Sequence, residues 1–343
     1  MSNPVLTRAI DRVAGGEDLP ADEAALVLRE VMEGGASEAE TAGFLMALRT
    51  KGETVQEIAG FASTLRALAL PVEAGGDLVD TAGTGGGRPT FNVSTTAAFV
   101  ASGAGCRVAK HGNRSATSQC GSADVLEALG ARIDLEPDAV ARCIDAVGFG
   151  FMFAPRHHSA MRYVVPVRKA LGVRTIFNFL GPLTNPAGAL RQVIGVSDPA
   201  FLDTMAGALA RLGARRALVV SSADGLDEMS TSGTTRVVEV DGSQLRRYEV
   251  SPEDVGLVRS RPEDIAGGTP DANAATTRRI LAGEPGPQRD LALLNAGAAV
   301  YVSGRVADLR SGVQAAAEAV DSGRATAALD ALAALTQELA AAA

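Results

Sequence analysis

A glycine-rich run follows the first strand expected in the chain, and its residue types suit a phosphate ligand. The run reads GTGGG at residues 83–87, directly after the strand candidate at 78–80. Glycines accept left-handed φ angles and let backbone N–H groups approach an anion closely. The spacing fits neither a P-loop, which needs a following Gly-Lys-Ser/Thr, nor GxGxxG, because Arg88 stands where the last glycine belongs. The run therefore indicates either a phosphate loop or a flexible turn.

Hydroxyl side chains open the helix that is expected next in the chain. The sequence NVSTT occupies residues 92–96. Asn, Ser and Thr are common N-cap residues, whose side chains accept hydrogen bonds from the first turn. A helix N-terminus with free N–H groups is also a favourable anion site. The sequence leaves both interpretations open.

Cationic residues gather after the second expected strand, at 107–109. The run KHGNRS at residues 110–115 combines a lysine, an arginine, an amide and a glycine. The lysine supplies a point charge and the arginine a bidentate fork, and both suit phosphate oxygens. A solvated charge run is the other interpretation. We favour the phosphate role, because a loop with Gly and Asn at a strand end is an unusual place for inert charges.

Two adjacent acids lie in the run DGLDE at residues 224–228, after another expected strand. Carboxylates that are neighbours in one loop, here Asp227 and Glu228, can both reach a hard cation. Mg²⁺ commonly takes one or two carboxylates together with substrate phosphates. Taken alone, the pair fits an exposed acidic surface at least as well.

The segment from 156 to 186 holds further candidates. Arg168 can bind a carboxylate through a bidentate pair if its side chain points into a pocket. Asn178 and Asn185 stand near Gly-Pro and Pro steps, which indicates shaped turns instead of coil.

Residues 1 to about 70 are expected to form helices only. The four segments lie at 4–14, 20–32, 37–49 and 54–70. Capping boxes open the third and fourth, with SEAE at 37–40 and TVQE at 54–57, and Pro71 ends the fourth. Four short helices cannot bury all of this apolar surface among themselves. We therefore expect them to pack on the rest of the chain or on a second copy.

Strands and helices alternate beyond Pro71. Strands are expected at 78–80, 107–109, 151–153, 217–221, 237–240 and 246–250, the last two as a hairpin. Alternation of this kind predicts an α/β fold with a mainly parallel sheet flanked by helices. Ligands of such folds bind at the carboxyl ends of the strands, where the motifs above should meet. We expect a helical domain at 1–71, with a segment near 166–188 packing on it, and an α/β domain at 72–343.

Composition narrows the class of partner. The 343 residues include 40 acidic and 32 basic ones, for a net charge of −8, which disfavours nucleic acid. Trp is absent and aromatic residues total 4%, which disfavours a base-stacking surface. The first residues lack the apolar core of a secretory signal, and the longest charge-free stretch, 89–106, is too polar for a membrane span. We expect a cytoplasmic protein with no membrane partner.

Taken in order, the motifs resemble one family, the anthranilate phosphoribosyltransferases of tryptophan biosynthesis. GTGG at 83–86, NVST at 92–95, KHGNR at 110–114, RTIFNFLGPLTNPA at 174–187 and DGLDE at 224–228 occur at that family's spacing. The resemblance spans nearly the whole chain. It implies transfer of 5-phosphoribose from phosphoribosyl pyrophosphate (PRPP) to the amino group of anthranilate, with release of pyrophosphate. It also implies a nucleoside phosphorylase/phosphoribosyltransferase-like fold, Mg²⁺ as cofactor and a homodimer formed through the helical domain.

The resemblance further implies roles for individual residues. PRPP would be held by Gly83, Thr84, Gly85, Gly86, Asn92, Ser94, Thr95, Lys110 and Ser122. Anthranilate would be held or lined by Gly83, His111, Asn113, His158, Arg168, Gly181 and Pro182. Mg²⁺ would be held by Ser94, Asp227 and Glu228. Lys110, together with the Mg²⁺ that Asp227 and Glu228 hold, would serve catalysis by stabilising the leaving pyrophosphate.

The chain departs from the family's pattern at two places. Gly87 stands where the family usually has Asp, and Arg88 beside it could compensate by touching a phosphate. If the departure is harmless, Gly87→Asp should be tolerated, whereas lost folding would indicate a rebuilt loop. Ser221 and Ser222 stand where relatives often have a His-Gly pair.

Two rival functions remain at this stage. A pyrimidine nucleoside phosphorylase would share the fold but use free phosphate and a nucleoside. The acidic pair and the GPLTNPA run at 181–187 favour the transferase. A non-catalytic relative that binds nucleic acid is the second rival, which the acidic composition disfavours.

Overall fold

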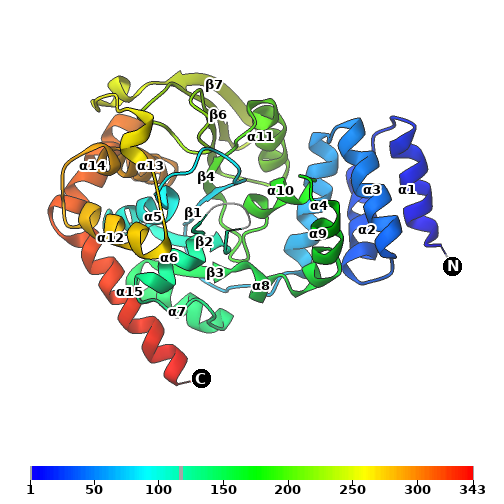
Figure 1. The fold of residues 1–343 in the computed structure, drawn as a ribbon, viewed down its shortest axis with the longest axis horizontal. Coiled ribbons are helices and arrows are strands. Elements are labelled where there is room, and N and C mark those ends of the chain that lie inside the picture. Colours follow the sequence, from blue (N-terminus) through cyan, green and yellow to red (C-terminus); the bar gives the residue numbers. More distant parts are fainter. Residues whose placement is uncertain (1, 116–118, 343) are drawn as a thin grey trace.

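A computed structural model describes residues 2–115 and 119–342 of the chain. Figure 1 shows a small bundle of helices at one end of the molecule and a larger body, built around a sheet, at the other. The predicted fold class is confirmed: a helical N-terminal part precedes an α/β body. In the described part of the chain, no helix combines the length and apolarity that crossing a bilayer requires.

Four helices form the N-terminal bundle. They are α1 Pro4–Ala14, α2 Ala21–Met32, α3 Glu38–Lys51 and α4 Val55–Leu68. Both predicted capping boxes are present: Ser37 and Glu40 exchange side-chain-to-backbone hydrogen bonds, and so do Thr54 and Glu57. Each box satisfies N–H groups that the first turn would otherwise leave unpaired. The sequence therefore fixes where α3 and α4 begin.

Seven strands form one sheet in the described part of the chain. They are β1 Leu78–Gly83, β2 Arg107–Gly112, β3 Phe149–Phe153, β4 Arg191–Gly195, β5 Arg216–Ser222, β6 Thr235–Asp241 and β7 Gln244–Val250. Their order is β3-β2-β1-β4-β5-β6-β7; the first five are mutually parallel, and β6 and β7 form the antiparallel hairpin at one edge. The strand β4 was not predicted. It lies in the middle of the sheet, beside β1.

Helices cover both faces of the sheet. The helices that follow α4 in the described part of the chain are α5 Val93–Gly103, α6 Ser122–Ala128, α7 Pro137–Val147, α8 Ala154–His157, α9 Val165–Leu171, α10 Phe177–Leu180, α11 Leu202–Arg211, α12 Pro270–Leu281, α13 Pro287–Val302, α14 Leu309–Asp321 and α15 Arg324–Ala341. Side chains alternate between faces along each strand. Val193 and Leu218 accordingly belong to the core under α5 and α13, whereas Ile194 and Val219 belong to the core shared with α11 and the N-terminal helices.

The segment between β3 and β4 crosses to the helical bundle. Val167 of α9 is buried in the same core as the N-terminal helices, and Figure 1 shows α9 beside them. Phe177 and Leu180 of α10 join that core too. The segment that carries Arg168 thus spans the junction between the bundle and the carboxyl ends of the central strands.

Candidate active site

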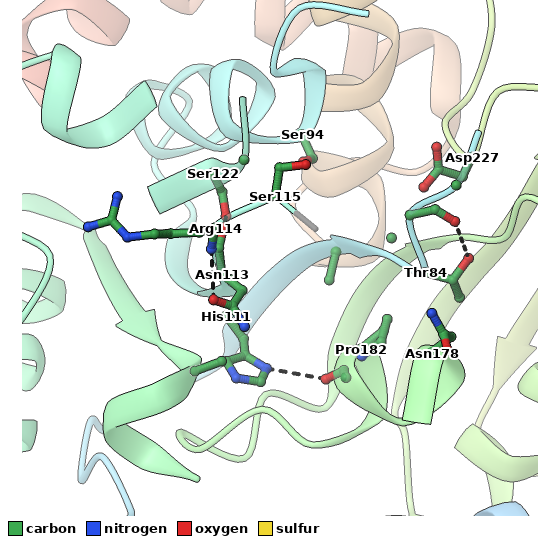
Figure 2. A pocket seen from close by; sticks show the side chains of 18 of the residues that line it. Thr84, Ser94, His111, Asn113, Arg114, Ser115, Ser122, Asn178, Pro182 and Asp227 are labelled. Atoms are coloured by element: carbon green, nitrogen blue, oxygen red, sulfur yellow. Dashed lines mark hydrogen bonds between the residues drawn. The ribbon is translucent and has the colours of Figure 1, made fainter. Parts of the chain in front are cut away.

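A cavity of about 930 Å³ lies at the carboxyl ends of β1 and β2. Every site residue expected from the sequence lines it: Gly83, Thr84, Gly85, Gly86, Asn92, Ser94, Thr95, Lys110, His111, Asn113, Ser122, His158, Arg168, Gly181, Pro182, Asp227 and Glu228. Figure 2 shows Ser94 and Asp227 on one side of the cavity, with His111 and Pro182 on another. Segments more than 140 residues apart therefore meet, as the carboxyl ends of parallel strands must.

The glycine loop at residues 83–87 begins where β1 ends. Gly85 and Gly86 have φ angles of +69° and +84°, a region that only glycine adopts without strain. The loop is docked at both ends: Thr84 N donates to Gly195 O at 2.8 Å, and Arg88 N donates to Gly225 O at 2.9 Å. Backbone N–H groups held in such left-handed turns form an anion-binding concavity.

The start of α5 supplies polar side chains that its own first turn does not use. No hydrogen bond among the described residues makes Asn92 a side-chain cap; its Oδ1 instead accepts from Asn273 Nδ2 at 2.8 Å and from Cys120 Sγ at 3.1 Å. The Thr95 hydroxyl is buried and has no partner within the described structure. The geometry favours the anion-site interpretation over capping, because the Asn92 side chain is bonded away from the first turn while the Thr95 hydroxyl remains available beside the helix N–H groups.

Lys110 of β2 lies beneath this anion site. Its side chain is 2% exposed, and Nζ donates to Thr81 O, to Thr81 Oγ1 at 3.3 Å and to Ser94 Oγ at 3.3 Å. Burial lowers the pKa of Lys110, and the nearby carboxylates of Asp80 and Glu228 oppose that effect. The ammonium is thus fixed where negative charge on a ligand would be stabilised.

The acidic pair, Asp227 and Glu228, lies beside the glycine loop. Burial raises the pKa of Asp227, while the N–H groups of Gly85 and Gly87 oppose it. Burial, with the adjacent Asp227, raises the pKa of Glu228 to about 8. Two crowded carboxylates of this kind favour a bound cation, which removes their mutual repulsion.

The donor set fits Mg²⁺ better than a metal enclosed entirely by protein ligands. No group of three or more His, Cys, Asp or Glu in the described ranges could hold a metal ion. Asp227 and Glu228 supply two carboxylates, and the Ser94 hydroxyl, which hydrogen-bonds to Glu228, supplies a third oxygen. Mg²⁺ typically completes such a set with waters and substrate phosphates.

Arg168 lines the same cavity and carries a guanidinium that could bind a ligand. No hydrogen bond or ion pair among the described residues uses its guanidinium, which lies 5.7 Å from the centre of the Phe177 ring. Burial lowers the pKa of Arg168 without removing its charge at neutral pH. A half-buried guanidinium without a partner is suited to a ligand carboxylate.

The rings of two cavity histidines, His111 and His158, lie next to each other. Their ring centres are 5.1 Å apart. His111 Nδ1 donates to Gly181 O at 3.2 Å, and the imidazole of His158 bonds the Thr184 backbone. Burial lowers the pKa of His111 to about 3 and that of His158 to about 4. Both rings are therefore neutral at pH 7, and each buried Nε2 lacks a partner within the described structure.

Two arginines that looked available for phosphate are used elsewhere. Arg114 pairs with Asp124 at 2.7 Å and with Glu127 at 2.6 Å, and Figure 2 shows its guanidinium pointing away from Asp227. Arg88 pairs with Asp224 at 3.0 Å. These pairs with acidic residues of α6 disfavour the phosphate interpretation of Arg114 in the KHGNR run, although Arg114 lines the cavity. Arg88 likewise ties the glycine loop to the acidic run.

Gly87 has no room for a side chain. A Cβ there would lie 2.4 Å from Asp227 Oδ1 and 2.8 Å from Asp227 N, and the latter is backbone that cannot simply rotate away. The absence of the family's usual Asp thus accompanies a loop packed directly against the acidic run. Ser222, the other departure, donates its hydroxyl to Glu228 O at 2.7 Å.

Sequence reasoning missed several side chains that shape the site. Arg174 and Asn178 line the cavity, and both stand in the quoted RTIFNFLGPLTNPA run, where their polar character was a usable signal. Asn273 and Asn295 lie outside the cavity. From α12, Asn273 donates to the Asn92 side chain, and from α13, Asn295 holds the backbone of Met229. Nothing in the sequence pattern of those helices marked them.

Comparison with known proteins places this geometry in a family. Residues 7–69 match the helical bundle domain of a glycosyl transferase family, and residues 75–326 match its a/b domain. The chain is 53% identical to anthranilate phosphoribosyltransferase of Rubrobacter xylanophilus over 98% of this chain and 99% of the relative. It is 50% identical to that of Moorella thermoacetica, over 98% and 100%.

Comparison with solved structures gives the same family. The crystal structure of the Thermus thermophilus anthranilate phosphoribosyltransferase shares 47% identity and a TM-score of 0.91, over 96% of this chain and 99% of that one. The Saccharomyces cerevisiae enzyme in complex with PRPP and Mg shares 27% identity and a TM-score of 0.89, over 98% and 99%. The chain described above belongs to the anthranilate phosphoribosyltransferase family.

Proposed function

We propose that this chain transfers the 5-phosphoribosyl group of PRPP to the amino group of anthranilate, a step of tryptophan biosynthesis. The products are N-(5-phosphoribosyl)anthranilate and pyrophosphate. The observation that carries the proposal is the convergence of an anion-binding half, around the glycine loop and Lys110, with a carboxylate-binding half, around Arg168, in one cavity. The yeast relative that contains PRPP and Mg supports the choice of donor and cation.

The donor side would hold the phosphates of PRPP. The proposed donors and acceptors are Gly83, Thr84, Gly85, Gly86, Asn92, Ser94, Thr95, Lys110 and Ser122. Backbone N–H groups of the loop and the start of α5 suit phosphate oxygens. The buried Lys110 ammonium would stabilise charge that develops on the leaving pyrophosphate.

Asp227, Glu228 and Ser94 would hold Mg²⁺. When bound, the cation neutralises pyrophosphate charge and thereby improves the leaving group. The two carboxylates would be ionised in that state, since the cation opposes the burial that raises their pKa.

The acceptor side would hold anthranilate. We propose that Arg168 binds its carboxylate, with Asn113 beside it, while Gly83, His111, His158, Gly181 and Pro182 line its path. This placement brings the amino group towards the donor side of the same cavity.

The chemistry needs little from a protein base. The acceptor is a neutral arylamine, so its lone pair is available at pH 7 without prior deprotonation. Bond formation between the amine nitrogen and the ribose C1 accompanies breakage of the C1–pyrophosphate bond, and the amine then loses one proton to water or to the released pyrophosphate. Orientation of two reactants in one cavity can supply about 7–11 kcal/mol of barrier reduction. Positioning therefore suffices for most of the rate.

The direct test mixes purified protein with Mg²⁺, PRPP and anthranilate and follows the loss of anthranilate fluorescence. The expected result is loss that requires all three components. Phosphorolysis of thymidine in place of this reaction would favour a nucleoside phosphorylase. Salt-sensitive binding to nucleic acid, without turnover, would favour the non-catalytic alternative.

We also propose that the protein is a cytoplasmic homodimer assembled through the helical domain at residues 1–71, with α9 adjoining it. Exposed apolar side chains support this: Leu26 of α2 is 46% exposed, and Val165 of α9 is 52% exposed. Apolar side chains exposed on the helical part are positions that a second copy could cover. The α/β domain, 72–343, would then hold most of each active site.

A further inference from the structure

Arg174 makes three contacts that join separate parts of the active site. Its Nη2 donates to Gly85 O at 3.2 Å, and its Nη1 donates to Ser197 Oγ at 2.9 Å. The guanidinium also lies 5.6 Å from the centre of the Phe179 ring. Arg174 and Phe179 belong to the segment that carries Arg168, whereas Gly85 belongs to the glycine loop.

The glycine loop is shaped to receive this guanidinium. A Cβ on Gly86 would lie only 2.7 Å from Arg174 Nη1, so the missing side chain is what permits the approach. Ser197, which accepts from Arg174, also contacts the loop: its backbone N donates to Thr84 Oγ1 at 3.4 Å. The loop is therefore held on one side by a planar fork with two acceptors and one aromatic face, which a lysine cannot reproduce.

We propose that Arg174 is a positioning residue that fixes the glycine loop in its phosphate-binding shape, so that the acceptor segment controls the affinity for the donor. The inference rests on the proposed function for the identity of the donor, PRPP. Two left-handed glycines make the loop conformationally free, and an unheld loop would lose entropy when a pyrophosphate bound it. Arg174 removes that loss in advance, because it holds the Gly85 carbonyl before any ligand arrives.

The test compares Arg174→Ala and Arg174→Lys with the unaltered full-length chain. Calorimetry with PRPP and Mg²⁺ should show a dissociation constant raised about tenfold or more in Arg174→Ala. Arg174→Lys should recover only part of that loss, because it keeps the charge but not the fork. The KM for anthranilate should change less than twofold in both variants, which separates this role from that of Arg168.

Hydrogen exchange supplies a readout that does not depend on substrate. The amides at residues 83–87 should exchange faster in Arg174→Ala while those of the central strands keep their protection. Arg211→Ala is the control, because Arg211 is an exposed arginine at the end of α11 that is not among the residues lining the cavity. It should leave both PRPP affinity and loop exchange unchanged.

Three outcomes would overturn the inference. They are unchanged PRPP affinity in Arg174→Ala, complete recovery in Arg174→Lys, or equal weakening of PRPP and anthranilate. Failure of the unaltered chain to bind PRPP would instead overturn the proposed function. Loop exchange would then still decide whether Arg174 holds the loop.

Discussion

The two histidines of the cavity are acceptors and not cations. Hydrogen bonds to carbonyl oxygens place the proton of each ring on Nδ1 and leave Nε2 as a lone-pair acceptor. Burial keeps both rings neutral, and the pKa values of about 3 for His111 and about 4 for His158 lie well below the ordinary value. The histidines thus add no positive charge to that of Arg168 for a carboxylate.

The lowered pKa of His158 predicts a pH-dependent stability. The unfolded state binds the proton of His158 more readily than the folded state does. The stability that the neutral ring contributes is therefore complete above pH 6.5 and is lost as the pH falls towards 4. For His158, the free energy of unfolding should fall by about 2 kcal/mol between pH 7 and pH 5. In urea titrations at the two pH values, His158→Asn should show a correspondingly smaller drop. An equal drop in both proteins would contradict the neutral, buried histidine.

Arg168→Ala should raise the KM for anthranilate while leaving that for PRPP nearly unchanged. Loss of a charge-assisted bond costs about 1.5–3 kcal/mol, which corresponds to roughly 10- to 100-fold. Steady-state kinetics with each substrate varied in turn measure both constants. The adjacent, exposed Lys169 offers a control, since Lys169→Ala should change neither. Equal effects of Arg168→Ala on both substrates would rule out the carboxylate role.

The packing at Gly87 favours the second of the two outcomes considered for Gly87→Asp, that of a rebuilt loop that does not accept the side chain. The new Cβ would strike Asp227, including its backbone N, so the loop or the acidic run must move. Such overpacking costs about 1–3 kcal/mol. We expect a lower midpoint in urea and weaker PRPP binding by calorimetry. Gly75→Asp is the control, because a Cβ there meets nothing within 4 Å. Wild-type stability in Gly87→Asp would show that the loop yields easily.

At the scale of elements, α13 holds the loop that we propose binds Mg²⁺. Asn295 is 2% exposed and bonds both backbone groups of Met229: Met229 N donates to Oδ1 at 3.0 Å, and Nδ2 donates to Met229 O at 2.9 Å. Nδ2 also donates to Leu291 O within α13. Met229 directly follows Asp227 and Glu228, so this clamp holds the backbone next to both carboxylates.

Asn295→Ala should therefore raise the Mg²⁺ concentration needed for half-maximal activity, and it should lower the free energy of unfolding by about 1–3 kcal/mol per unsatisfied buried group. Kinetics at varied Mg²⁺ and urea titration measure the two effects. Asn295→Asp keeps the acceptor for Met229 N and should lie between the two proteins. Gln288→Ala, on a partly exposed turn of the same helix, should behave as wild type. An unchanged Mg²⁺ requirement in Asn295→Ala would contradict the clamp.

The sequence predicts those elements whose signals are local. Capping boxes place the starts of α3 and α4, and the Asp-Gly turn places the β6–β7 hairpin. The strand β4 could not be predicted, because it is only five residues long, begins with the polar pair Arg-Gln and follows an irregular stretch. Its position matters, since Gly195 at its end accepts the hydrogen bond of Thr84 N. The contacts of Asn273 and Asn295 could not be predicted for another reason, because their partners lie 181 and 66 residues away along the chain.

At the scale of the whole molecule, the topology explains why the predicted site residues share one cavity. Parallel strands end at the same edge, so loops that follow β1, β2 and β5 meet there whatever their separation in sequence. The irregular segment after β3 adds Arg168 and Arg174, because it spans from the helical bundle to that edge. Ion pairs such as Arg114 with Glu127 could not be read from spacing, since they depend on which way α6 faces.

The helical bundle should associate with a second copy. We expect light scattering behind size exclusion to give about twice the 35.0 kDa chain mass. Leu26→Glu and Val165→Glu place charge on exposed apolar positions and should shift the mass towards the monomer. Val258→Glu is the control, since Val258 is 77% exposed but lies far along the chain from the bundle. A monomer at micromolar concentration would contradict the proposed dimer.

A crystal structure with PRPP and Mg²⁺ tests the central claim most directly. The account predicts pyrophosphate density against the glycine loop, the start of α5 and Lys110, with a cation between it and the Asp227–Glu228 pair. It also predicts that the ribose C1 faces the side of the cavity that holds Arg168. PRPP bound outside this cavity, or held there without contact to the glycine loop, would contradict the account.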